Sequence, residues 1–104
     1  MKEYDKLVRD KIPEIIERDG RAYGTEAVSG DELLSYLDRK LDEEVAEFRE
    51  SLDPEELADV MEVLFSLASR LGISEEELIG IRERKRAERG GFEKGIVLKW
   101  MGDD

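Results

Sequence analysis

The chain has 104 residues, with 28 acidic residues, 17 basic residues, no cysteine and no histidine. A length of this order predicts one domain, over residues 1–104. The net charge of −11 argues against nucleic-acid polymers and anionic membranes as partners, because both are bound through Lys and Arg. The missing cysteine and histidine exclude disulfides, thiol chemistry, zinc clusters of these ligands and histidine-based catalysis.

The hydropathy pattern predicts a cytoplasmic protein with a modest core. The opening segment MKEYDKLVRDK lacks the apolar run of a signal peptide, and no stretch of 18 apolar residues occurs in the chain. A domain of this size buries somewhat over roughly 60% of its unfolded surface, so self-association would add to its stability.

The first part of the chain is predicted to hold one short helix. Residues 10–19 suit such a helix, because Pro13 falls in its first turn and Gly20 follows its end. Residues 21–29 are expected to be extended or irregular.

Two long helices are predicted for the middle of the chain. Ser29 and Glu32 have the spacing of a capping box, which opens a helix over residues 31–51. Asp53, as an N-cap followed by a proline, opens a second helix over residues 54–71. The two-residue connection makes the helices antiparallel, as a hairpin. An apolar stripe with helical spacing lies on the first of them: Leu34, Leu37, Leu41, Val45, Phe48 and Leu52.

A last helix begins at Ser74, which forms a capping box with Glu77, and ends by Gly90 and Gly91. Residues 92–101 are expected to form a short strand or a tail docked on a partner. The predicted fold is therefore all-α, an antiparallel helical bundle with at most a short β pair from the termini.

Acidic side chains border the apolar faces of both long helices. Glu44 and Glu47 lie on one flank of the first stripe. Glu56 projects within the apolar arc of the second helix, with Asp59 at its edge. The hairpin brings the two pairs level, and burying four carboxylates together is costly unless a cation compensates. Oxygen ligands without histidine suit Mg²⁺ or Mn²⁺, so the pattern predicts a metal site that processes phosphates.

Three of the four acids also have an ordinary alternative role. Glu56 stands where the third residue of a capping box would stand, and Glu44 and Glu47 taken singly are typical of helix-surface acids. Asp59 is harder to assign to structure alone, because Asp is a poor helix former within an apolar run. The register of all four together favours the metal site.

Charge is unevenly distributed along the chain. Residues 38–62 contain eleven acids and three bases, whereas residues 82–101 contain seven bases and three acids. The two regions are either complementary parts of one site or two solvated helix faces that neutralise each other.

Two acidic motifs carry a family resemblance. The segments Lys40–Glu47 (KLDEEVAE) and Glu55–Val60 (EELADV) resemble the paired ExxE and ExxD motifs of the MazG-like all-α nucleoside triphosphate pyrophosphohydrolases. The segments Lys6–Ile16 (KLVRDKIPEII) and Arg89–Leu98 (RGGFEKGIVL) resemble the short branch described as phosphoribosyl-ATP pyrophosphohydrolase-like, or house-cleaning, enzymes. The likeness spans nearly the whole chain.

The resemblance implies a Mg²⁺ site, with Mn²⁺ as the alternative ion. Its metal would bind the substrate phosphates and a water that attacks the α-phosphorus, releasing a nucleoside monophosphate and pyrophosphate. Glu47 is the expected catalytic residue, which polarises that water. Lys40, just before the acidic motif, is expected to neutralise phosphate charge. The implied metal ligands are Glu44, Glu47, Glu56 and Asp59.

The resemblance also implies a homodimer or a dimer of dimers, with helices from two subunits around each site. Lys85 and Arg89 of the last helix would then meet the triphosphate, where guanidinium groups suit bidentate contacts. Arg9 and Lys11, near the start of the chain, are expected to do the same. The alternative role of these bases is to pair with surface acids.

The implied function is therefore a Mg²⁺-dependent nucleoside triphosphate pyrophosphohydrolase that acts on noncanonical or surplus nucleotides. Two alternatives stay open at this point. One is phosphoribosyl-ATP hydrolysis, and the other is a noncatalytic helical dimerisation or regulatory module.

Overall fold

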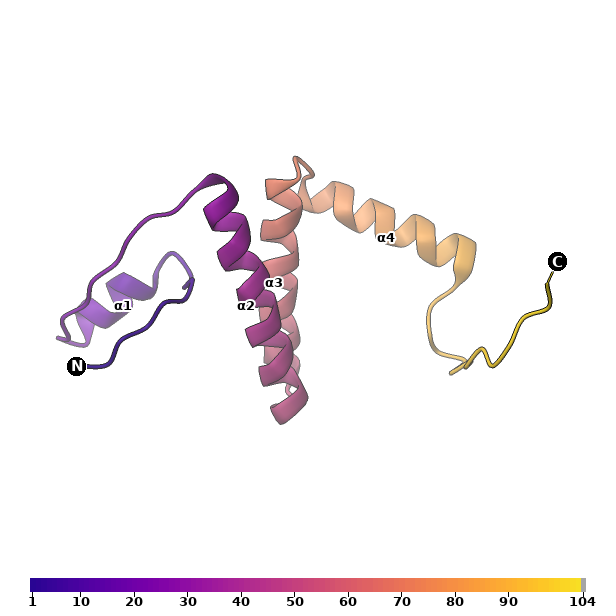
Figure 1. The fold of residues 1–104 in the computed structure, drawn as a ribbon, viewed down its shortest axis with the longest axis horizontal. Coiled ribbons are helices and arrows are strands. Elements are labelled where there is room, and N and C mark those ends of the chain that lie inside the picture. The colour runs from indigo at the N-terminus through magenta and orange to yellow at the C-terminus, as the bar shows by residue number, and fades with distance from the viewer. Residues whose placement is uncertain (104) are drawn as a thin grey trace.

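The computed structural model describes residues 1–103, and over these residues the protein is all-α, with four helices and no strand (Figure 1). The all-α prediction is confirmed, and the optional β pair is not formed among these residues. Asp104, the end of the predicted domain, lies outside the described residues. The helices are α1 (Ile12–Arg18), α2 (Gly30–Ser51), α3 (Pro54–Arg70) and α4 (Glu75–Arg89).

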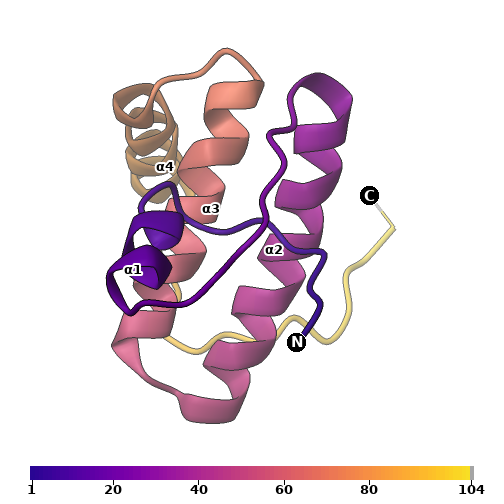
Figure 2. The ribbon, with the colours of Figure 1, turned by 90° about the vertical axis from the view of Figure 1, so that its left-hand side faces the viewer.

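Helices α2 and α3 form the predicted antiparallel hairpin, and its tip is built by two residues (Figure 2). Leu52 has φ 55°, in the left-handed region, and its N–H donates to the carbonyl of Phe48 at 2.7 Å. The Asp53 carboxylate accepts from the N–H of Glu55 at 2.9 Å, which confirms Asp53 as the N-cap of α3. The chain therefore reverses direction within Leu52 and Asp53.

The capping-box alternative for Glu56 is not realised. The N–H of Asp53, which a capping box would bond to the Glu56 side chain, donates instead to the hydroxyl of Ser51 at 3.1 Å. The Glu56 carboxylate is thereby left for another use.

The other two predicted caps differ in outcome. Ser74 and Glu77 form a full capping box, with the Glu77 N–H donating to the Ser74 hydroxyl at 3.1 Å. Ser29 makes no cap hydrogen bond, so the capping box predicted there is wrong. The physical reason is the conformation of Gly30, which begins α2 with φ 58°. Because that φ is not helical, the Ser29 side chain is not placed as a capping box requires, although the Leu33 N–H still donates to the Ser29 carbonyl at 3.2 Å.

The core lies along the seam between α2 and α3. Its buried apolar residues are Leu37 of α2 and Val63 and Ala68 of α3. Neither α1 nor α4 contains a buried residue. The hairpin is therefore the part of the chain that holds fixed geometry, and it also carries the acidic motifs.

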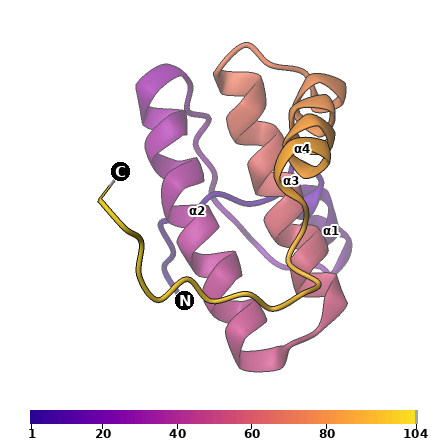
Figure 3. The same ribbon diagram turned by 90° about the vertical axis from the view of Figure 1, so that its right-hand side faces the viewer.

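The chain is more open than the predicted bundle. Helix α4 packs only against α3 near the junction and then runs away from the hairpin, while α1 lies on the opposite side (Figures 1 and 3). The radius of gyration is 18.4 Å, against about 13 Å for a compact chain of this length. Within one chain the predicted bundle is thus a hairpin with two outlying helices, neither of which buries a residue.

Large apolar side chains of the C-terminal tail, residues 92–101, stay in solvent. The tail extends from the end of α4 without packing on the hairpin (Figure 1). The exposed large residues of the tail are Phe92, Ile96, Val97, Leu98, Trp100 and Met101.

No helix among residues 1–103 is long and apolar enough to span a bilayer.

Replacing Asp53 with alanine is expected to lower the free energy of unfolding by about 1 kcal/mol, because the first turn of α3 loses its acceptor. Urea unfolding followed by far-UV circular dichroism measures this change. Asp53→Asn keeps an acceptor and should stay within about 0.5 kcal/mol of the original protein. Ser29→Ala should do the same, and equal losses in Asp53→Ala and Ser29→Ala would contradict the assignment of the caps.

Candidate metal centre

Three carboxylates converge in the groove between α2 and α3. Glu44 comes from α2, and Glu56 and Asp59 come from successive turns of α3. One oxygen of each side chain can be chosen so that all three oxygens lie within 4.8 Å of one another. The antiparallel register predicted from sequence therefore brings these acids together, as a group that can hold a metal ion.

Glu44 is the buried member of this group, with 6% of its surface exposed. Its Oε1 forms an ion pair with Lys40 Nζ at 3.2 Å, whereas its Oε2 is buried without a hydrogen-bond partner. Burial raises the pKa of Glu44, Lys40 opposes that rise, and the negative charges of Glu47 and Asp59 add to it. One buried carboxylate oxygen is thus short of a positive partner, which is costly in a low-dielectric site.

Glu56 is half-buried beside the other acids. Burial raises its pKa, and the charges of Glu47, Asp59 and Glu44 raise it further. Burial and mutual repulsion therefore oppose the ionisation of all three carboxylates at once. A cation placed among the three carboxylates would reverse that effect, because an opposite charge favours the ionised form.

Glu47 lies next to the three-carboxylate group and outside it. Its side chain is exposed, and no oxygen of it belongs to the set within 4.8 Å. Its charge still reaches both Glu44 and Glu56, since it raises the pKa of each. The residue predicted to activate water thus has solvent access, while the other three predicted ligands are more enclosed.

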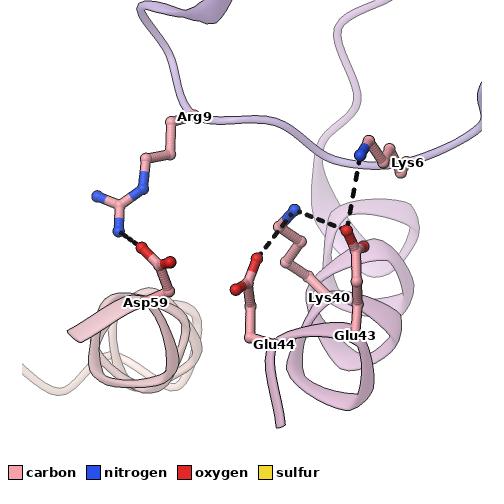
Figure 4. A network of polar contacts seen from close by, with 6 residues as sticks. All are labelled: Lys6, Arg9, Lys40, Glu43, Glu44 and Asp59. Carbon is pink, nitrogen blue, oxygen red and sulfur yellow. Dashed lines mark hydrogen bonds and ion pairs between the residues drawn. The ribbon is translucent and has the colours of Figure 1, made fainter. Parts of the chain in front are cut away.

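Two basic residues already neutralise part of the acidic group (Figure 4). Lys40 contacts Glu43 at 3.3 Å as well as Glu44, and Arg9 Nη2 lies 2.7 Å from Asp59 Oδ1. Both were predicted near the phosphates from sequence. A small cavity of about 70 Å³ lies beneath them, lined by Leu7, Leu37, Glu44, Asp59 and Val63 among others.

The sequence did not predict the ion-pair partners of Lys6 and Arg9. Lys6 Nζ lies 3.7 Å from Glu43, so Lys6 and Arg9 straddle the groove from one short segment (Figure 4). Their spacing of three residues in the opening motif was the available signal. That spacing does not identify the partners of the two side chains, because the position of an irregular segment is set by tertiary contacts.

The remaining predicted phosphate ligands lie elsewhere in the chain. Lys11 is the exposed residue just before α1. Lys85 and Arg89 line an open concavity of about 970 Å³ beside the C-terminal tail. Helix α4 lies across the hairpin from α1 and the N-terminal segment (Figure 1). A single chain therefore does not bring Lys85 and Arg89 to the acids, because α4 runs away from the hairpin.

Comparisons with known proteins give one partial match. A stretch of 44 residues, 42% of this chain, is 54% identical to part of an uncharacterized protein of Mycolicibacterium smegmatis. The matched stretch covers 45% of that protein, so the match spans just under half of its length. No family model and no solved structure matches the chain.

Replacing Glu44 with glutamine is expected to raise the free energy of unfolding by about 1 kcal/mol in EDTA. The neutral amide removes a buried charge whose Oε2 has no partner, and it removes repulsion from Glu47 and Asp59. Lys40 keeps its contact with Glu43. Urea unfolding in EDTA measures the difference.

The matched control is Glu50→Gln, which makes the same charge change at an exposed position of α2. Its stability should stay within about 0.5 kcal/mol of the original protein. A divalent cation held by the three carboxylates would stabilise the original protein more than Glu44→Gln, because it would bind the folded state through this carboxylate. A Glu44→Gln protein less stable than the original in EDTA would contradict the description of Glu44 as an under-compensated charge.

Proposed function

We propose that this protein is a Mg²⁺-dependent nucleoside triphosphate pyrophosphohydrolase that acts on noncanonical or surplus nucleotides in the cytoplasm. The single observation that carries the proposal is the buried Oε2 of Glu44, which has no partner and belongs to a side chain grouped with Glu56 and Asp59. An ordinary surface cluster of acids would leave its oxygens in water. The resemblance of the two acidic motifs to MazG-like enzymes supports the same reaction.

The donor set fits a hard divalent cation. It consists only of carboxylate oxygens, contains no histidine or cysteine, and has one orphaned oxygen at its buried end. These properties favour Mg²⁺ or Mn²⁺ over softer metals. Glu44, Glu56 and Asp59 would hold the ion, with Glu47 beside them. The bound ion would supply positive charge to the triphosphate and a more acidic water.

The chain's own residues would do the rest of the work. Lys40 holds Glu44 Oε1 and is largely buried, so it fixes the direction of that carboxylate. Glu47 is exposed and charged next to the group, which suits a proton acceptor for the attacking water. Arg9 is half-exposed, and its guanidinium pairs with Asp59. The same guanidinium would be within reach of phosphate oxygens that enter the groove.

The working assembly we propose is a homodimer or a dimer of dimers. Support comes from the open shape of one chain, the small core and the exposed apolar side chains of the tail. Association would also let the basic α4 of one subunit face the acidic groove of another. Lys85 and Arg89 would then reach the substrate phosphates, as would Lys11.

The reaction is tested by pyrophosphate release from canonical, deoxy, oxidised and deaminated nucleoside triphosphates and from phosphoribosyl-ATP, with Mg²⁺, Mn²⁺ or EDTA. We expect metal-dependent release from one or a few nucleotides. Glu44→Gln and Asp59→Asn should each lower kcat by about 100-fold or more, because each removes a ligand from the reacting site. Glu50→Gln, with the same charge change on the exposed face, should keep full activity.

Full activity in Glu44→Gln or Asp59→Asn would overturn the assignment of the site. Silence across the whole panel would favour the noncatalytic dimerisation module. Release from phosphoribosyl-ATP alone would replace the proposed substrate class with that one substrate.

The assembly is tested by sedimentation equilibrium. We expect a mass of two or four times 12.0 kDa for the original chain. Leu98→Ser with Trp100→Ser should shift the protein toward monomer, because each side chain removed from an interface loses about 2 kcal/mol of burial. Tyr23→Ser, which removes an exposed apolar residue outside the tail, is the control. A monomer at all concentrations would contradict the proposed assembly.

A further inference from the structure

The N-terminal segment of residues 5–9, here called the strap, crosses the groove that holds the acids (Figures 2 and 4). At its start, Asp5 accepts from the hydroxyl of Tyr36 and lies 3.6 Å from Arg39 Nη1, both on α2. Next, Lys6 pairs with Glu43, also on α2. At its end, Arg9 pairs with Asp59 on α3. Five residues therefore tie α2 to α3 across the face of the candidate metal centre.

The strap is held almost entirely by side chains. Among the described residues, 5–8 make no backbone hydrogen bond, and the Arg9 carbonyl accepts only from the N–H of Ile12. Leu7 is half-buried and lines the small cavity together with Leu37 and Val63. The ion pairs are 45–55% exposed on the strap side at Lys6 and Arg9, and exposed pairs contribute little stability each. A segment held in this way opens at low cost.

The two ends of the strap have different relations to the acidic group. Asp5 and Lys6 are anchored on residues of α2 that lie outside the three-carboxylate set. Arg9 is bound to a member of the set, because its guanidinium contacts Asp59 Oδ1 at 2.7 Å. The guanidinium therefore serves as a built-in counter-charge for Asp59. A second cation among the same carboxylates would repel it and draw on the same negative charge.

We propose that the strap is a cation-sensitive latch: Arg9 closes it on Asp59, and a divalent cation bound by the acids releases that end while Asp5 and Lys6 stay anchored. The released guanidinium is then free to bind an anion that enters with the metal, such as a triphosphate. This inference rests on the metal site of the proposed function. Because binding linkage is reciprocal, the closed latch must weaken cation binding by the same factor by which the cation weakens the latch.

The first test measures the affinity of the full chain for Mn²⁺ alone, by titration calorimetry without nucleotide. Arg9→Gln is expected to bind Mn²⁺ about three- to tenfold more tightly than the original protein, because the competing guanidinium is gone. The matched control is Lys6→Gln, which removes one positive charge from the same strap at a position that pairs with Glu43. It should change the affinity less than twofold.

The second test follows trypsin cleavage of the original protein after Arg9, at the end of the strap that the cation releases, with and without Mn²⁺. Release of the latch predicts several-fold faster cleavage there when Mn²⁺ is bound. Cleavage after Lys99 in the exposed tail is the internal control and should not change. This readout needs no substitution, so it holds even if Arg9→Gln folds poorly.

The outcomes separate the latch from the metal site. Tight Mn²⁺ binding with equal affinities for Arg9→Gln and Lys6→Gln, or with strap cleavage unchanged by Mn²⁺, would overturn the latch and leave the proposed function standing. An absence of Mn²⁺ binding in both the original protein and Arg9→Gln would overturn the metal site and the proposed function together.

Discussion

The structure depends on one costly feature, a carboxylate buried in the only well-packed seam of the described chain. Glu44 sits between α2 and α3 with one oxygen bonded to Lys40 and the other without a partner. Two further acids from α3 come to the same place. A seam stabilised by apolar contact alone would place leucine or alanine there. The acids therefore reduce stability at the point where the hairpin packs, and compensation of their charge links the fold to the chemistry.

Much of the hairpin could be predicted because its signals are local. Helix periodicity, the Asp53 cap and the capping box at Ser74 each involve residues within a few positions of one another. The convergence of Glu44, Glu56 and Asp59 followed from the same local information, since a two-residue tip fixes the register. The Ser29 cap failed for a local reason too, because Gly30 adopts a non-helical φ that the residue pattern does not specify.

The rest could not be predicted because it depends on contacts between distant segments. The pairing of Lys6 with Glu43 and of Arg9 with Asp59 joins residues of an irregular segment to two helices. The position of α4 has the same origin, since its weakly amphipathic surface does not determine what it packs against. Lys85 and Arg89 were expected to meet the triphosphate in an assembly of subunits, and within one chain they lie beside the C-terminal tail. Hydrophobic periodicity therefore predicts where a helix forms, but not which elements it packs against.

The left-handed Leu52 has an evolutionary consequence. It is the only non-glycine residue with positive φ among those described, and it turns the chain within two residues between α2 and α3. One residue inserted at this tip would rotate α3 by about 100° about its axis relative to α2. That rotation would carry Glu56 and Asp59 away from Glu44 while leaving every side chain intact. Lineages of this protein should therefore accumulate substitutions at the tip far more readily than changes in its length.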